Sequence, residues 1–99
     1  MNSQPMSVVR MTATVHGRVQ GVGYRYWTHH TAHGLPLVGG TVRNLSDGGV
    51  EVKAEATSKE PLNQLLTELR HGPTTAHVED VDVIFEDAVP ATTEGFHVV

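Results

Sequence analysis

The chain has 99 residues, which is enough for one domain with a single modest hydrophobic core. Its formal net charge of −4 lacks the basic excess of a nucleic-acid-binding protein, and the absence of cysteine excludes disulfides and thiolate metal sites. No stretch approaches the roughly 20 apolar residues of a membrane span, so we expect a cytoplasmic protein with neither nucleic acid nor membrane as partner.

Residues 1–7 mix polar residues with Pro5, and we expect them to form a flexible leader to a single domain over residues 8–99. Apolar and polar residues alternate from Val8 onward, which is the pattern of a half-buried strand. The residues predicted to face the core are Val9, Met11, Ala13 and Val15. After a glycine-rich loop, apolar residues recur at helical spacing, and Gly34 is expected to end this first helix.

Two further strands are predicted over residues 41–44 and 50–56. The turn between them contains Asp47-Gly48, and this pair favours the positive φ angles that a hairpin requires. Alternation in the third strand predicts three solvent-facing residues, which are Glu51, Lys53 and Glu55.

The second helix is predicted from an apolar stripe that follows Pro61 and stops before Gly72-Pro73. The stripe consists of Leu62, Leu65, Leu66 and Leu69. The alternating residues of a fourth strand are Val81, Val83 and Phe85, and a short fifth strand contains Phe96 and Val98. This βαββαβ order with a terminal strand predicts a ferredoxin-like α+β sandwich of the split βαβ type, with two helices on one face of a mostly antiparallel sheet.

The loop over residues 17–25 is the most distinctive segment. Its glycines allow tight bends that bring backbone N–H groups close to an anion at the start of a helix. The spacing lacks the Lys-Ser/Thr end of a P-loop, and Tyr26 stands where a dinucleotide-binding motif needs its third glycine. Two interpretations remain, a phosphate-binding loop or a tight turn that needs glycine for its geometry alone.

Arg25 favours the phosphate site. It falls in the first turn of the helix, where the positive end of the macrodipole makes a cation unfavourable by about 0.3–1 kcal/mol. Residues that are locally unfavourable in this way are typical of functional positions. A guanidinium also forms paired hydrogen bonds with phosphate oxygens. Since residues 1–50 hold four arginines against one Asp, we expect basic charge to gather near the loop. The alternative is a solvated surface arginine.

Asn44 is the second unusual residue. Alternation places it on the same face as Val42, where an amide without hydrogen-bond partners is costly. At the end of a strand it can instead face a water-filled cleft, where its amide holds a water by donating and accepting hydrogen bonds. The alternative is that Asn44 fixes the turn over residues 45–49.

Seven histidines raise the question of a metal site. His29 and His33 share a helix face, but the glutamate of the H-E-x-x-H motif is missing, so we interpret both as solvent-facing and expect no metal. Tyr24 and Trp27, at helical spacing, are interpreted as core residues rather than as a stacking platform.

Two segments resemble the signatures of the acylphosphatase family. The run G-x-V-Q-G-V-G-Y-R over residues 17–25 resembles the first signature, and G-x-V-x-N-x-x-D-G-x-V over residues 40–50 resembles the second. Later matches, G-P-x-x-A-x-V over residues 72–78 and G-F at residues 95–96, extend the resemblance over residues 8–99.

The resemblance implies hydrolysis of the carboxyl–phosphate bond of small acyl phosphates without metal or cofactor, with inorganic phosphate as product and inhibitor. The family's phosphate-binding arginine corresponds to Arg25 and its water-orienting asparagine to Asn44. The residues that would offer backbone amides to the phosphate are Gln20, Gly21, Val22, Gly23 and Tyr24. We expect the enzyme to be a monomer.

The sequence departs from the family pattern between the two signatures. The link over residues 34–40 is about one residue longer than usual and contains Pro36, and Thr41 replaces a common tryptophan. The extra residue lies upstream of Asn44, so the position of Asn44 relative to Arg25 depends on how this link folds.

Two other functions fit the same fold class. Ferredoxin-like domains include non-catalytic anion-binding, RNA-binding and regulatory modules, although this sequence has no RNP1-like motif. An acylphosphatase-like domain can also serve a larger carbamoyl-transfer protein. Because the sequence holds no zinc-finger or transferase segment, we expect a free-standing enzyme.

Overall fold

The computed structural model describes residues 7–99. The predicted leader lies outside the described residues except for Ser7, which already belongs to the first strand. In chain order the elements are β1 (Ser7–Arg18), α1 (Tyr24–His33), β2 (Gly39–Asn44), β3 (Val50–Ala56), α2 (Glu60–His71), β4 (His77–Pro90) and β5 (Gly95–Val98).

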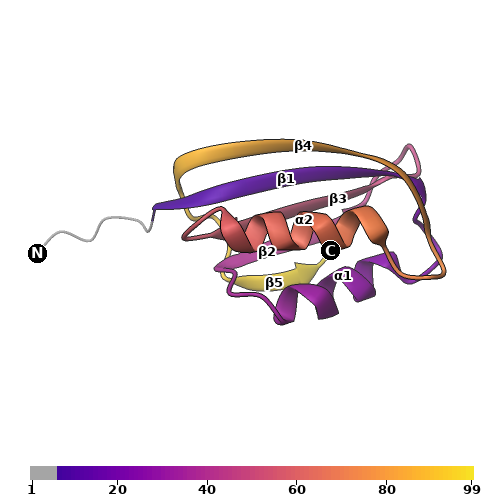
Figure 1. Ribbon diagram of the computed structural model, residues 1–99, viewed down its shortest axis with the longest axis horizontal. Helices are drawn as coiled ribbons and strands as arrows, with labels where there is room; N and C mark the ends of the chain where they lie inside the picture. The colour runs from indigo at the N-terminus through magenta and orange to yellow at the C-terminus, as the bar shows by residue number, and fades with distance from the viewer. Residues whose placement is uncertain (1–6) are drawn as a thin grey trace, which may run out of the picture.

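The strands form one sheet in the order β4-β1-β3-β2-β5. β1 pairs antiparallel with β3 and β4, whereas β2 pairs antiparallel with β3 and parallel with β5. Both helices lie against the same face of the sheet, as Figure 1 shows. The architecture is therefore the ferredoxin-like α+β sandwich that the sequence predicts.

Three strands are longer than the sequence predicts. β1 runs on to Arg18, inside the segment predicted to be loop. β4 extends beyond its apolar alternation because it pairs with nearly all of β1, from Ser7 opposite Pro90 to Arg18 opposite His77. β2 begins two residues earlier than expected, at a pair of glycines. At Gly40 a Cβ would lie 2.3 Å from the Lys53 carbonyl oxygen and collide with Phe96, so the close packing of three strands requires glycine there.

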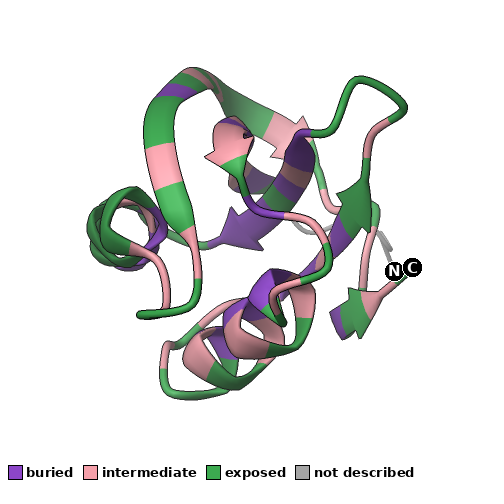
Figure 2. Cartoon of the chain, turned by 90° about the vertical axis from the view of Figure 1, so that its right-hand side faces the viewer, coloured by how far each residue is buried: buried purple, intermediate pink, exposed green. Residues whose placement is uncertain are grey.

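The core lies between the sheet and the helices, where the buried residues gather in Figure 2. Val9 is half-buried and packs against the core as predicted, whereas Val8 is buried outside the core cluster. The other core residues predicted for β1 are fully buried, as are three leucines of the α2 stripe. These residues are Met11, Ala13, Val15, Leu62, Leu65 and Leu69.

Glu55 breaks the expected pattern on the opposite face of the sheet. Alternation predicts a solvent-facing residue, yet Glu55 is only 1% exposed because the link between β4 and β5 packs against it. Its carboxylate accepts hydrogen bonds from the backbone N–H and hydroxyl of both Thr92 and Thr93, at 2.7–3.1 Å. Arg10 completes the set, with Nε 2.9 Å and Nη2 2.8 Å from Oε2. This buried carboxylate is therefore well compensated.

The environment of Glu55 makes the fold sensitive to acid. Burial alone raises the pKa of Glu55, but hydrogen bonds from Thr93, Arg10 and Thr92 outweigh it and lower the pKa from 4.5 to about 2. Because the folded-state pKa is the lower one, the carboxylate stabilises the fold above pH 4.5, by roughly 3 kcal/mol. This stability is lost as the pH falls toward 2.

We expect the free energy of unfolding, measured with urea, to decrease as the pH falls from 4.5 toward 2. Glu55→Gln, which lacks the titrating group, is expected to be less stable at neutral pH and to show a smaller decrease in acid. Urea unfolding followed by circular dichroism at several pH values measures both proteins. An equal acid dependence in the two proteins would contradict the assignment of this stability to Glu55.

Candidate active site

The loop between β1 and α1 turns on glycines with left-handed backbone conformations. Gly21 has φ 73° and Gly23 has φ 83°, and any residue with a Cβ is strained at such values. At either glycine, no atom beyond the adjoining residues lies within 4 Å of the position that a Cβ would take, so this side of the loop is open. The first N–H groups of α1, which have no partners within the helix, begin where the loop ends. An open glycine loop at a helix N-terminus is suited to binding an anion.

Hydrogen bonds to two neighbouring segments hold the loop in place. The Gln20 amide donates to the carbonyl oxygens of Leu45, at 2.7 Å, and Gly49, at 2.8 Å. The Thr75 hydroxyl donates to the Val22 carbonyl oxygen at 2.7 Å. The first contact ties the loop to the turn after β2, and the second ties it to the segment before β4.

Tyr24, the first residue of α1, anchors the other end of the loop. Its ring is buried, its hydroxyl donates to the Leu69 carbonyl oxygen at 2.7 Å, and burial raises the pKa of the phenol. Trp27 packs beside it, with 5.3 Å between ring centroids. The interpretation of both aromatic residues as part of the packed interior is correct.

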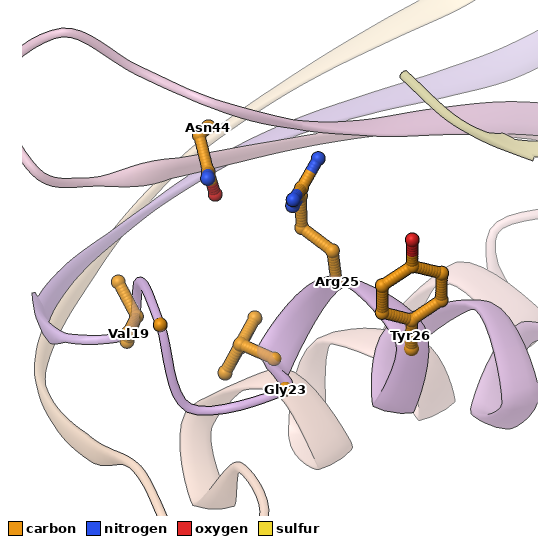
Figure 3. A pocket seen from close by; sticks show the side chains of 7 residues that line it. Val19, Gly23, Arg25, Tyr26 and Asn44 are labelled. Atoms are coloured by element: carbon orange, nitrogen blue, oxygen red, sulfur yellow. The ribbon is translucent and has the colours of Figure 1, made fainter.

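A pocket of about 180 Å³ lies between this loop and the end of β2 (Figure 3). Figure 3 shows the Arg25 side chain rising from the start of α1 between Asn44 and Tyr26. The lining residues are Val19, Gly21, Gly23, Tyr24, Arg25, Tyr26 and Asn44.

Arg25 has most of its donors free. Its Nη1 donates to the Val99 carbonyl oxygen at 3.3 Å, and its guanidinium carbon lies 6.0 Å from the centre of the Tyr26 ring. Within residues 7–99 no Asp or Glu side chain forms an ion pair with Arg25. The guanidinium is thus held at one corner, and its remaining N–H groups are available to an anion in the pocket.

Asn44 is exposed at the pocket rather than buried with Val42, because the strand passes the edge of the core at this point. Its side chain makes no hydrogen bond to the described part of the chain. The following turn is held instead by Gln20 and by Asp47, whose Oδ1 accepts the Gly49 N–H at 2.9 Å. These contacts favour the cleft interpretation of Asn44 over a turn-fixing role.

The link over residues 34–40, which departs from the family pattern, ends in the first two residues of β2. The Leu37 N–H donates to the Leu35 carbonyl oxygen at 2.9 Å, and the Val38 N–H donates to the Glu55 carbonyl oxygen at 2.7 Å. β2 then starts at Gly39 in regular register with β3. The longer link therefore leaves Arg25 and Asn44 on the same pocket.

Five of the seven candidate site residues line the pocket, whereas Gln20 and Val22 do not. Gln20 uses its side chain against the neighbouring turn, and Val22 packs against the core. Sequence reasoning missed Val19, and it left Tyr26 without a role although that side chain is 68% exposed beside Arg25. The only sequence signal for Tyr26 is that it follows Arg25 and falls off the buried stripe of α1.

Arg10 does not belong to the basic charge expected near the loop. Arg10 lies eight residues before the end of β1, roughly 26 Å along the strand, where it pairs with Glu55. Arg43 pairs with Glu51 at 2.9 Å on the sheet. Among the lining residues, Arg25 is the one cation.

The histidine pair lies on α1, away from the pocket lining. The Nε2 atoms of His29 and His33 are 3.3 Å apart, and the His29 ring also approaches Phe96. Over residues 7–99 there is no cluster of three or more His, Cys, Asp or Glu side chains that could hold a metal ion.

Comparison with known proteins identifies the family. The family model described as Acylphosphatase matches residues 11–98. The acylphosphatase of Salinibacter ruber is 47% identical over 89 residues, which cover 90% of each chain. The acylphosphatase of Mycobacterium sp. (strain KMS) is 44% identical over 97 residues, which cover 98% of each chain.

The fold comparison agrees. The crystal structure of acylphosphatase from Bacillus subtilis has a TM-score of 0.84 at 31% identity and covers 92% of this chain and 98% of that one. The chain therefore belongs to the acylphosphatase family, which makes it a hydrolase of small acyl phosphates. In the described part of the chain, no helix has the length and apolar character to span a membrane.

We predict that Gln20→Leu weakens the site by separating the loop from the turn after Asn44. The substitution removes the side-chain donor of two carbonyl oxygens that keep backbone donors, the N–H of Gly48 for Leu45 and the N–H of Leu45 for Gly49. We expect a loss of about 0.5–1.5 kcal/mol of stability together with a lower kcat/KM. Urea unfolding and steady-state kinetics measure both effects. Gln64→Leu, at an exposed position of α2, is the matched control. Full activity in Gln20→Leu would show that this contact does not maintain the pocket.

Proposed function

We propose that this pocket hydrolyses acyl phosphates, with Arg25 and the loop amides binding the phosphoryl group and Asn44 orienting the attacking water. The observation that carries the proposal is that Arg25 and Asn44, which come from separate segments of the chain, line one small pocket beside an open glycine loop.

The donors suit a phosphoryl group. Residues 20–24 offer backbone N–H groups at the positive end of the α1 macrodipole, and Arg25 adds a permanent charge with several N–H donors. Phosphoryl transfer passes through a loose transition state with charge spread over three equatorial oxygens. Fixed donors around these oxygens lower the barrier by positioning and by electrostatic stabilisation.

The leaving group explains why so few catalytic side chains are needed. An acyl phosphate is a mixed anhydride, and its carboxylate departs without prior protonation. The pocket lining includes no carboxylate or imidazole, and its buried Tyr24 phenol, with a raised pKa, is a poor proton donor. In this proposal the substrate's own phosphate takes the proton of the water that Asn44 aligns.

The central experiment is the release of phosphate from benzoyl phosphate in the presence of EDTA, with inorganic phosphate as a competitive inhibitor. We expect activity to persist in EDTA and Arg25→Ala to lose phosphate affinity and turnover together, by at least about 100-fold in kcat/KM. Arg70→Ala, at an exposed position of α2, is the matched control. Phosphate binding without turnover in the wild-type protein would favour a non-catalytic anion-binding module.

We predict that Asn44→Ala mainly lowers kcat, on the order of 100-fold, because the aligned water matters in the reaction rather than in substrate binding. KM for benzoyl phosphate and the inhibition constant of inorganic phosphate are expected to change little. The control is Asn63→Ala, at an exposed position of α2. Wild-type kcat in Asn44→Ala would remove Asn44 from the mechanism.

The remaining features of the proposal concern the state of the enzyme. We propose a single domain over residues 8–99 that acts as a monomer, takes a small acyl phosphate as its substrate and is inhibited by its phosphate product. The cytoplasmic location stays a prediction from the sequence.

A further inference from the structure

The Glu55 carboxylate is the most elaborately bound side chain outside the pocket, and the proposed mechanism gives it no part. It has six side-chain and backbone donors around two oxygens, at 2.7–3.1 Å, and is 1% exposed. A buried charge of this kind is costly to assemble, and much of its donor set comes from one short link.

That link fixes the start of β5. Four of the donors belong to Thr92 and Thr93, which stand three and two residues before Gly95. The link packs tightly, because a Cβ at Gly39 would lie 2.7 Å from the Thr93 hydroxyl and 2.7 Å from the Gly95 carbonyl oxygen. The Gly95 N–H donates to the Val38 carbonyl oxygen at 3.1 Å. Glu55 thus sets where β5 begins on the edge of β2.

The other end of β5 reaches Arg25. β5 follows β2 in parallel register from Gly95 opposite Gly39 to Val98 opposite Val42. The Val99 N–H then donates to the Val42 carbonyl oxygen at 3.0 Å, and the Val99 carbonyl oxygen accepts from Arg25 at 3.3 Å. β5 lies at the sheet edge beside α1, as Figure 1 shows.

We infer that Glu55 is a positioning residue for Arg25, acting through the link at residues 91–94 and the four residues of β5. The inference rests on the proposed function, which makes Arg25 the phosphate ligand. β5 has one strand neighbour, and a strand of four residues at a sheet edge is easily frayed. When the hydrogen bonds between Glu55 and the link are lost, β5 frays and Val99 moves away from Val42. The Arg25 guanidinium then loses its hydrogen bond to the Val99 carbonyl oxygen.

Loss of the Glu55 contacts is expected to change the orientation of Arg25 but not the position of Asn44, the residue proposed to orient the water. Asn44 sits opposite Val50 on β3 and before a turn held by Gln20, so its position does not depend on β5. Loosening β5 lowers the fraction of molecules in which Arg25 is correctly oriented. The apparent affinity for phosphate decreases by that fraction, while bound substrate restores the orientation and leaves kcat nearly unchanged.

The test is Glu55→Gln, whose amide places N–H donors against the donors of Thr92 and Thr93. We expect KM for benzoyl phosphate and the inhibition constant of inorganic phosphate to rise by the same factor, about 3- to 10-fold, with kcat within about 2-fold of wild type. Assays are run well below the melting temperature of the variant. Thr93→Val, which removes one hydroxyl donor, is expected to show a smaller shift in the same direction.

The matched control is Glu51→Gln, which changes a carboxylate on the same strand and face that pairs with Arg43 and does not touch the link. A change in KM equal to that of Glu55→Gln would overturn the inference. It would also be overturned by wild-type KM and inhibition constant in Glu55→Gln, whatever the melting temperature, because a purely structural role changes stability alone.

A second readout does not need turnover and so separates this inference from the proposed function. By NMR, Glu55→Gln is expected to speed hydrogen exchange of the Val99 amide and to shift the Arg25 Nε–H signal, and Glu51→Gln to do neither. If benzoyl phosphate is not hydrolysed but these changes occur, the proposed function fails and the positioning role stands. Unchanged Val99 exchange and Arg25 signal in Glu55→Gln would refute the positioning role.

Discussion

Strand β3 runs antiparallel to both of its neighbours, and the pocket depends on this pairing. Because β1 and β2 each run antiparallel to β3, they point in the same direction, and their carboxyl ends lie at the same end of the sheet. The glycine loop leaves β1 at that end, and Asn44 ends β2 there. Helix α1 carries the chain back to the opposite end of the sheet, and β2 then returns it to the end where the loop lies. There the Gln20 side chain joins the loop to the turn that follows β2.

Two anion environments in this small domain use the same kinds of donor. Inside the fold, backbone N–H groups, hydroxyls and the Arg10 guanidinium surround Glu55 and hold its pKa at about 2. At the pocket, the glycine loop and the Arg25 guanidinium border open space. The donors around Glu55 are satisfied by the chain itself, whereas those at the pocket are the ones that the proposed function assigns to the phosphoryl group. The shift at Glu55 shows how strongly such donors favour negative charge once solvent is excluded.

Much of the fold could be predicted from sequence, because its signals are local. Alternation in β1 and β3, the leucine stripe of α2 and the glycines before α1 each report on their own segment. The two signatures identified Arg25 and Asn44 as candidates, but their placement on one pocket also depended on how residues 34–40 fold. The ends of β2 and β4 could not be predicted in this way, because pairing with neighbouring strands extends both beyond their own apolar patterns.

The residues that sequence reasoning misplaced depend on contacts far along the chain. Glu55 reads as a solvent-facing residue of an alternating strand, and its burial comes from Thr92 and Thr93, nearly forty residues later. The contact of the Gln20 side chain with the turn after β2 could not be predicted either, because the family resemblance concerns only its backbone N–H. Arg10 looks like part of a basic cluster until its register with Glu55 is known. No periodic pattern in one segment contains this information.

The position of β4 at the end of the sheet has a consequence for the behaviour of the protein at high concentration. An edge strand of fourteen residues offers a long row of backbone groups on which another chain can add. β4 carries five acidic residues and no lysine or arginine: Glu79, Asp80, Asp82, Glu86 and Asp87. Like charges on an approaching second copy repel at neutral pH, and protonation removes that repulsion. Self-association along β4 is accordingly opposed at neutral pH.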